Sequence, residues 1–293
     1  MDRGQIAYAF DGLLRRARQK CLCPSCRSDR SERVDRKVFH ELRRCRDCAL
    51  LYRWPYETAE EMARFYQTDY RQAGLTTDLP DDATLRTLLE TGFAGTQKDF
   101  SRLVDLLAAL SVPQGARILD YGANWGYGVW QLRRAGYSAL GYEVSQPRAR
   151  YSDKLDVEVA TQWPEIEARG PFDVVFSAHV LEHTPDPAGA LREQLGVLAP
   201  GGWLIACFPN GSDAFRKADP AAFHRLWGRV HPVMLDEAFV RHTLPTPSLA
   251  VGAFCPADLD RFRHWDRATA WTGTLDTGEL LVVYAKSGEA VHA

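Results

Sequence analysis

The chain has 293 residues, of which 45% are hydrophobic and 25% charged, as in an ordinary soluble globule with a core domain of about 200 residues plus an appendage. Its net charge of −2 excludes a general electrostatic attraction to nucleic acid or anionic membranes. No apolar run approaches the roughly 18 residues of a membrane span, and the charged N-terminus does not resemble a signal peptide, so we expect no membrane partner and a cytoplasmic location.

Residues 1–20 predict a basic amphipathic helix. Ile6, Phe10 and Leu13 would lie on one side, and four cations gather in residues 15–20. Positive charge in a last turn suits the helix dipole, so these cations need no binding partner.

Five of the seven cysteines fall within residues 21–48. Cys23 and Cys26 form one Cys-x-x-Cys knuckle, and Cys45 and Cys48 form a second one 18 residues later. Each two-residue gap lets both sulfurs of a tight turn face one ion. The spacing therefore predicts a Zn²⁺ site with these four ligands, whereas an odd, clustered cysteine count argues against disulfides.

Cys21 could replace Cys23 as a ligand, although the tighter pair is preferred. Val34, Val38 and Leu42 alternate between the knuckles as in a short hairpin. Because so few apolar residues lie there, we expect the metal to supply much of the folding energy of this segment.

After this segment, the sequence indicates a connecting helix near 57–67 and then a looser stretch around Gly74, Pro80 and Asp81-Asp82. A helical pattern over 96–110 leads into the main domain.

From there, short apolar runs alternate with helical patterns, which predicts a parallel sheet covered on both faces. Asp186-Pro187 is typical of a helix start, with an N-cap followed by proline. Residues 248–255 and 279–286 read as two strands with no helix between them. The expected strands before these two lie near 116–121, 138–143, 155–159, 172–177 and 201–208.

The most informative stretch is 117–126, where an apolar strand ends in Asp120 and is followed by Gly122 and Gly126 before a helix. Small residues at such a turn let the backbone approach a bound nucleoside at the helix N-terminus. Glu143 closes the next apolar run, about where an acid binds ribose hydroxyls in such units. These features alone do not choose between NAD and S-adenosylmethionine.

An insertion over 209–247 follows the fifth strand, at the sheet edge where open α/β folds bind ligands. Its aromatic and histidine side chains could form substrate walls, or the segment could be a lid packed on its own apolar residues. Its notable residues are Asn210, Phe215, Phe223, His224, Trp227 and His231.

Four segments in the same order resemble the class I S-adenosylmethionine-dependent methyltransferases. They are 117–126, 139–143, the strand that runs into Leu-Glu-His over 172–183, and the Pro-Gly-Gly turn and strand over 198–205. The resemblance covers about residues 95–288. Where the family usually reads Asp-x-Gly-x-Gly-x-Gly, Asn124 replaces the middle glycine, and asparagine tolerates a left-handed backbone.

The resemblance implies an α/β, Rossmann-like, seven-stranded methyltransferase sheet that is mostly parallel with the last strand antiparallel. The cysteine segment resembles the zinc-binding head fused to several bacterial methyltransferases. We therefore expect an N-terminal helix over 1–20, a zinc ribbon over 21–55, a helical linker over 56–94 and the class I domain over 95–288.

The resemblance also implies site residues. Glu143 would bind both ribose hydroxyls, Val144 and Gln162 would wall the adenine, and residues 177–179 would face the sulfonium and the acceptor. The full expected set around S-adenosylmethionine is Asp120, Gly122, Ala123, Asn124, Gly126, Glu143, Val144, Gln162, Ser177, Ala178 and His179.

For a general base, histidine suits neutral pH best. His179 and His231 are the leading candidates and His183 the third, although the histidine of the Leu-Glu-His turn is more often structural. An acidic carbon acceptor needs only positioning, so a reaction without an essential base stays open.

Three functions are compatible with these patterns. The preferred one is methylation of a small molecule, such as a sugar or secondary metabolite, with zinc in a structural role. The first alternative is an RNA methyltransferase, because residues 11–53 carry 13 Arg/Lys against 6 Asp/Glu. The second is a non-catalytic zinc scaffold with a degenerate cofactor site.

Overall fold

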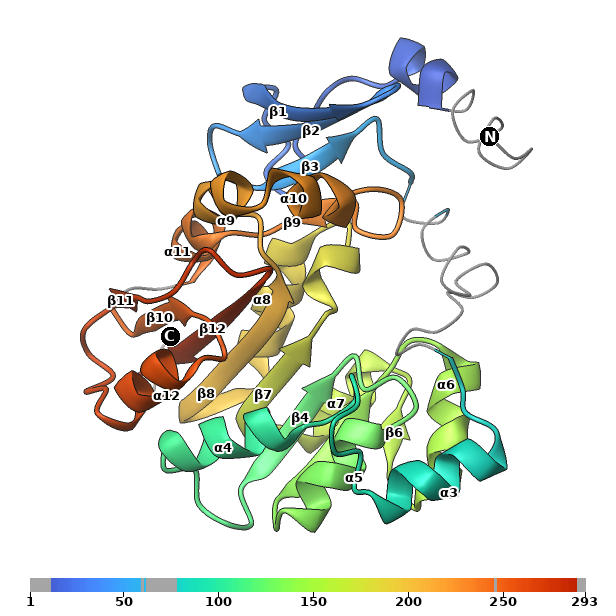
Figure 1. Cartoon of the computed structure of the whole chain (residues 1–293), viewed down its shortest axis with the longest axis vertical. Coiled ribbons are helices and arrows are strands. Elements are labelled where there is room, and N and C mark those ends of the chain that lie inside the picture. The colour runs from blue at the N-terminus through green and yellow to red at the C-terminus, as the bar shows by residue number, and fades with distance from the viewer. Residues whose placement is uncertain (1–11, 59–60, 62–77, 245–246, 289–293) are drawn as a thin grey trace.

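The computed structural model describes residues 12–58, 61, 78–244 and 247–288. Two sheets organise the chain, a large one in the middle of the molecule and a small one formed largely by the cysteine-rich segment at one end (Figure 1). Among the described residues, no helix combines the length and apolar character needed to cross a bilayer.

The large sheet has the strand order β11-β10-β12-β8-β7-β4-β5-β6. Strands β4, β5, β6, β7 and β8 pair in parallel, and the last strand, β12, is antiparallel to both neighbours. The expected fold class is thus confirmed, with a two-residue eighth strand, β11, added at one edge. The strand bounds are β4 Arg117–Tyr121, β5 Ser138–Tyr142, β6 Val159–Ala160, β7 Phe172–Ala178, β8 Leu198–Pro209, β10 Leu249–Gly252, β11 Trp271–Thr272 and β12 Glu279–Ala285.

Helices cover both faces of this sheet because successive strand residues point to opposite sides. In β4, Ile118 packs into the apolar cluster that includes Leu103 of α4 and Val129 of α5. The next residue, Leu119, packs into the cluster on the opposite face with residues of α7, α8 and α11. The helix bounds are α3 Asp82–Glu90, α4 Ser101–Ala109, α5 Tyr127–Arg134, α6 Gln146–Tyr151, η2 Ser152–Leu155, α7 Trp163–Arg169, η3 Leu181–His183, α8 Pro187–Gly196, α9 Asp213–Ala218, α10 Pro220–Leu226, α11 Glu237–Thr243 and α12 Pro256–Arg263.

The small sheet has the order β1-β2-β3-β9 and joins two segments that lie far apart in the sequence. Strands β1 (Ser31–Lys37), β2 (His40–Cys45) and β3 (Leu51–Trp54) come from the cysteine-rich segment. Strand β9 (Val233–Met234) belongs to the 209–247 insertion and pairs with β3. In Figure 1, α9, α10 and β9 lie between the first three strands and the large sheet.

The apolar residues of this ribbon do not pack alone. Leu42 and Leu51 are fully buried against four side chains of the insertion, Phe215, Phe223, Trp227 and Met234. The expectation that the metal must replace a missing core was therefore incomplete, because a segment 180 residues downstream supplies apolar partners.

Within the segment expected to be a helical linker, residues 82–90 form α3, and Asp81 caps this helix by accepting a hydrogen bond from Thr84 N at 2.8 Å. Helix α4 begins at Ser101 rather than near 96, because Asp99 accepts backbone hydrogen bonds from Gly95 and Ser101 and holds a turn there. Residues 12–18 are helical as expected. Residues 1–11 and most of the expected 57–67 helix lie outside the described residues.

Two further corrections concern the third strand of the sheet and the segment between its last two main strands. The third strand is only the two residues of β6, because η2 occupies 152–155 and Asp156 has a left-handed backbone with φ of 54°. A helix, α12, does lie between the last two main strands. It begins at Pro256 and buries Phe262 in the core.

Candidate functional site

The loop from β4 to α5 has the left-handed backbone that its sequence predicts. Gly122, Asn124 and Gly126 have φ of 89°, 53° and 83°, so asparagine does adopt the conformation of the glycine that it replaces. A Cβ on Gly122 would collide with Val180. The loop conformation thus depends on residues that tolerate a left-handed backbone, and the missing side chain of Gly122 leaves room for Val180.

Glu143 follows β5 and holds this loop in place. Its Oε2 accepts a hydrogen bond from Asn124 N at 3.1 Å, and its Oε1 accepts one from Ser145 N at 2.7 Å. Burial raises the pKa of Glu143, although the two backbone donors and Arg148 act in the opposite direction. Each carboxylate oxygen has a second lone pair, so both can still accept a hydroxyl.

Asp120 lies beneath the N-terminal turn of α5. A Cβ on Gly128 would lie 2.5 Å from Asp120 Oδ2, so only glycine lets the helix approach this close. Asp120 is almost completely buried, and this burial, together with the nearby charge of Glu143, raises its pKa to about 7. The side chain is thus a buried acid that supports the loop from below.

A cavity of about 720 Å³ opens above the carboxyl ends of β4, β5 and β7, where the strand order reverses. Its volume falls within the range of about 300–1,000 Å³ that is usual for small-molecule and cofactor sites. The sequence-predicted residues that line it are Gly122, Asn124, Glu143, Val144, Ala178, His179 and His183.

Five predicted cofactor residues do not line the cavity. Asp120, Ala123 and Gly126 lie behind its wall and shape the loop. Ser177 is buried on the opposite side of β7, because strand neighbours alternate and Phe176 and Ala178 take the cavity side. Gln162, expected at the adenine, is instead exposed at the start of α7, because β6 ends two residues earlier.

Several cavity residues were not anticipated from the sequence. Phe100 lies in the turn before α4, Tyr127 is the first residue of α5, and Arg148 belongs to α6. Phe254 and Glu279 reach the cavity from the C-terminal part of the sheet. Only Tyr127 had a local signal, since it follows Gly126 directly. The others depend on contacts between distant segments.

His179 follows β7 and lines the cavity between two carboxylates. Its Nε2 lies 2.7 Å from Glu279 Oε1 and its Nδ1 lies 3.2 Å from Glu182 Oε1. Desolvation opposes a charge on the imidazole, but the two carboxylates outweigh it and raise the pKa of His179 to about 10.

The other two candidate bases lie side by side but only one reaches the cavity. The rings of His183 and His231 have centroids 4.9 Å apart. His183 lines the cavity and His231 does not, because His231 Nδ1 donates to Leu226 O at 2.7 Å within its own loop.

The aromatic residues of the insertion, candidates for substrate walls, do not line the cavity. Phe215, Phe223 and Trp227 are buried against the ribbon, and none of them lines the cavity. Asn210 is also structural, since its Nδ2 donates to the carbonyl oxygens of Leu275 and Thr277. These aromatic residues are packed, as the second alternative expected, but they pack against the ribbon as well as against one another.

The two cysteine knuckles of the ribbon fold alike. Arg27 N donates to Cys23 O at 3.0 Å, and Ala49 N donates to Cys45 O at 3.1 Å. Arg27 and Ala49 also share a left-handed backbone, with φ of 63° and 62°. Each turn therefore presents its two sulfurs in the same way.

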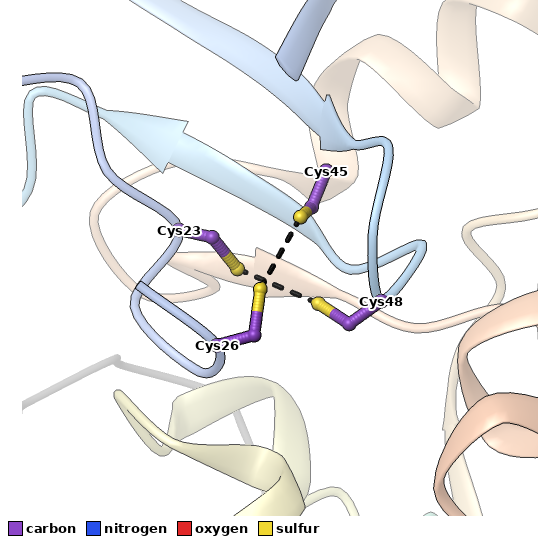
Figure 2. A group of neighbouring side chains, drawn as sticks. All are labelled: Cys23, Cys26, Cys45 and Cys48. Atoms are coloured by element: carbon purple, nitrogen blue, oxygen red, sulfur yellow. Dashed lines mark hydrogen bonds between the residues drawn. The ribbon is translucent and has the colours of Figure 1, made fainter. Parts of the chain in front are cut away.

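Figure 2 shows the four sulfurs pointing toward one another. The Sγ atoms of Cys23 and Cys48 are 3.5 Å apart, as are those of Cys26 and Cys45. Zn–S bonds of about 2.3 Å in a tetrahedron require sulfur separations of about 3.8 Å, so the donor set fits a zinc ion. Cys21 lies outside the cluster, with its Sγ 3.7 Å from Tyr52 Oη.

Comparison with known proteins agrees with this geometry. The family described as "Methyltransferase domain" matches residues 95–250, which is more than half of the chain. Ubiquinone biosynthesis O-methyltransferase from Ralstonia nicotianae is 32% identical over 111 residues, which cover 35% of this chain and 47% of that protein. Methyltransferase GfsG from Streptomyces halstedii is 28% identical over 160 residues, which cover 51% and 54%.

The chain thus spans about half the length of the curated relatives that it matches. Among solved structures, magnesium protoporphyrin IX methyltransferase from Synechocystis is similar at 16% identity and a TM-score of 0.44, over 79% of this chain and 92% of that one. The family match, the strand order and the glycine loop lead to one conclusion. This chain belongs to the methyltransferase domain family, and its large sheet has the class I methyltransferase fold.

Proposed function

We propose that the chain methylates a small molecule bound in the cavity above β4, β5 and β7, with Glu143 at the ribose of S-adenosylmethionine. The observation that carries this proposal is the cavity itself, a space of about 720 Å³ that includes Glu143, the glycine loop and His179. A wall of aromatic rings suits an organic acceptor better than a charged polymer. These rings belong to Phe100, Tyr121, Tyr127, Tyr142, Phe176 and Phe254.

S-adenosylmethionine supplies an activated methyl group, which is transferred by in-line displacement. The chain's own residues have to bind, align and exclude water. Glu143 accepts ribose hydroxyls, the loop at Gly122 gives the backbone close access, and the aromatic rings keep water out. Of the three candidate bases, His179 and His183 line the cavity. Because its pKa is raised to about 10, His179 is protonated at neutral pH, so His183 is the better candidate for accepting a proton.

The charges on the ribbon favour this function over an RNA methyltransferase. Eight of the thirteen cations in residues 11–53 lie within 4 Å of a carboxylate. Glu41 alone pairs with Arg16 and Arg43, and Asp236 of the insertion pairs with Arg44. These cations hold the ribbon to itself and to the core, which leaves a smaller positive surface for phosphates.

We further propose that the four cysteines bind a structural Zn²⁺ that fixes the ribbon against the insertion. The ribbon meets the core through Ser25 Oγ, which donates to Asp186 Oδ1 at 2.6 Å. Asp186 begins α8 as expected but makes no cap hydrogen bond, because its carboxylate binds Ser25 instead. The metal would thereby secure the start of α8, which follows the cavity-lining residues His183 and Thr184 in the chain.

A labelled-methyl assay tests the proposed function. The full chain is incubated with S-adenosylmethionine carrying a radioactive methyl group and, separately, with a panel of hydroxylated small molecules or with total RNA at low and moderate salt. Label in at least one small molecule, with none in RNA, supports the proposal. Label in RNA that falls steeply with salt supports the RNA alternative, and cofactor binding absent by calorimetry supports the non-catalytic scaffold.

A further inference from the structure

We propose that Glu182, His183 and His231 form a second metal site, separate from the cysteine cluster, at the wall of the cavity. One side-chain ligand atom from each residue lies within 4.8 Å of the other two. Because His183 lines the cavity, an ion bound to its imidazole at about 2.1 Å would sit at the cavity surface.

The fold brings the three residues together from two distant segments. Glu182 and His183 belong to η3, just after β7, whereas His231 lies in the insertion between α10 and β9. The pairing of β9 with β3 fixes the end of the loop that carries His231. No sequence spacing predicts such a set, and the Cys-x-x-Cys rule cannot find it.

Both imidazoles are held in the tautomer that a metal ligand needs. His183 Nδ1 lies 2.7 Å from Val230 O, and His231 Nδ1 lies 2.7 Å from Leu226 O. A carbonyl oxygen only accepts hydrogen bonds, so Nδ1 carries the proton in each ring and Nε2 of the neutral ring carries the lone pair. Metal-ligating histidines are usually oriented by such a hydrogen bond from the other ring nitrogen.

The burial of Glu182 is a second, independent observation in favour of a bound cation. Its side chain is 0% exposed, and its Oε1 lies 3.2 Å from His179 Nδ1. Its Oε2 is buried and has no hydrogen-bond partner among the described residues. A buried carboxylate oxygen without a partner is costly, and a bound cation would remove that cost.

The donor set selects the class of ion. Two imidazoles and one carboxylate suit Zn²⁺, Fe²⁺, Mn²⁺ or Co²⁺ and leave positions open for other ligands. Glu182 Oε1 and His183 Nε2 are 3.9 Å apart, whereas donors on one ion at about 2.1 Å are about 3.4 Å apart in a tetrahedron. The distances to His231 are no longer than 4.8 Å, so movements of about half an ångström for the first pair and at most about 1.4 Å for the others would complete the site.

The site would also specify the acceptor, an inference that rests on the proposed function. A cation at the cavity wall lowers the pKa of a coordinated hydroxyl, which favours an oxygen acceptor. The hydroxyl proton leaves to solvent, the oxygen bonds to the methyl carbon, and the electron pair of the broken C–S bond returns to sulfur. We therefore infer a hydroxylated acceptor.

Cobalt binding to the full chain tests the site directly. The purified protein, with its cysteine site filled with zinc, is titrated with Co²⁺ and followed by calorimetry and visible absorption. We expect one Co²⁺ per chain with weak visible bands and no thiolate charge-transfer band, because the ligands are nitrogen and oxygen. His231→Ala and Glu182→Gln should each weaken binding by about 100-fold, since even outer-shell changes cost 10- to 100-fold.

His224→Ala is the matched control, because His224 lies on the same insertion but binds Asp35 on the ribbon, and it should leave Co²⁺ affinity unchanged. S-adenosylhomocysteine binding by each variant shows that its cavity is folded. No Co²⁺ bound beyond the cysteine site, or affinity unchanged in both ligand variants, overturns the proposal. Wild-type protein that binds S-adenosylhomocysteine but no such Co²⁺ rejects the metal site alone, whereas the reverse result rejects the proposed function alone.

Discussion

The ribbon and the edge of the large sheet at the carboxyl ends of β4, β5 and β7 share one plan, but they differ in what distant segments supply. In the ribbon, the reactive atoms come from two short local turns, but the apolar partners come from the insertion 180 residues downstream. At the sheet edge, the loop and strand ends come from local sequence, but part of the cavity wall arrives from residues such as Phe254 and Glu279. In both regions, the residues that carry the chemistry are close in sequence, whereas some residues that pack against them come from distant segments. Mutations can separate the two contributions.

The largest effect should come from removing a cysteine ligand. Cys48→Ser should release the metal and unfold the ribbon, because structural zinc sites contribute on the order of 10 kcal/mol of binding free energy. Metal analysis by mass spectrometry and limited proteolysis measure this, while the sheet edge should still bind S-adenosylhomocysteine. Cys21→Ser should keep the metal, since Cys21 lies outside the cluster. A full zinc equivalent in Cys48→Ser would contradict the assigned ligand set.

The next largest effect should come from removing an apolar side chain that the insertion packs against the ribbon. Trp227 is fully buried between the insertion and the ribbon, so Trp227→Ala should lower the free energy of unfolding by about 3–5 kcal/mol. Urea denaturation measures this loss. Leu226→Ala, at the neighbouring position that ends α10 but only partly buried, should cost less. A loss below about 1 kcal/mol for Trp227→Ala would show that the metal alone stabilises the ribbon.

At the sheet edge, Glu143→Ala should weaken S-adenosylhomocysteine binding by about 1–3 kcal/mol, or roughly 5- to 150-fold. The variant loses charged hydrogen bonds to the ribose and also the two backbone bonds that order the loop. Calorimetry gives the dissociation constant. Glu158→Ala, on the exposed surface nearby, is the control and should bind normally. An unchanged constant in Glu143→Ala would remove the ribose assignment.

A smaller effect tests the buried acid beneath the loop. The pKa of Asp120 is about 7 in the folded chain and about 4 when unfolded, so the folded state holds the proton more tightly. Stability from this group is fully present below pH 4 and is lost as the pH rises through 7. Asp120→Asn should therefore gain about 2 kcal/mol relative to wild type between pH 5 and pH 7. Urea midpoints at both values measure it, and a parallel pH dependence in the two proteins would contradict the raised pKa.

The sequence predicted those parts of the fold that depend on nearby residues. Strands β4, β5, β7 and β12 begin within about one residue of expectation, because each carries a dense apolar run. Helix α12 was missed, since its apolar face is short and it is defined mainly by burial of Phe262. Strand β6 was misplaced because edge strands need little apolar sequence.

At the site, too, the sequence predicted the residues placed by local motifs and missed those placed by distant contacts. Gly122, Asn124 and Glu143 line the cavity as local motifs indicate. Gln162 does not, because its position depends on where an edge strand ends. The pairing of His183 with His231 could not be read from spacing, because it requires the insertion to fold back against η3.

A crystal structure of the chain with bound S-adenosylhomocysteine tests the central claim most directly. We expect the adenosyl group above the ends of β4 and β5, with both ribose hydroxyls on Glu143 and the sulfur near Ala178 and His179. Density for the ligand at any other place, or a saturated crystal with an empty cavity, would contradict the account.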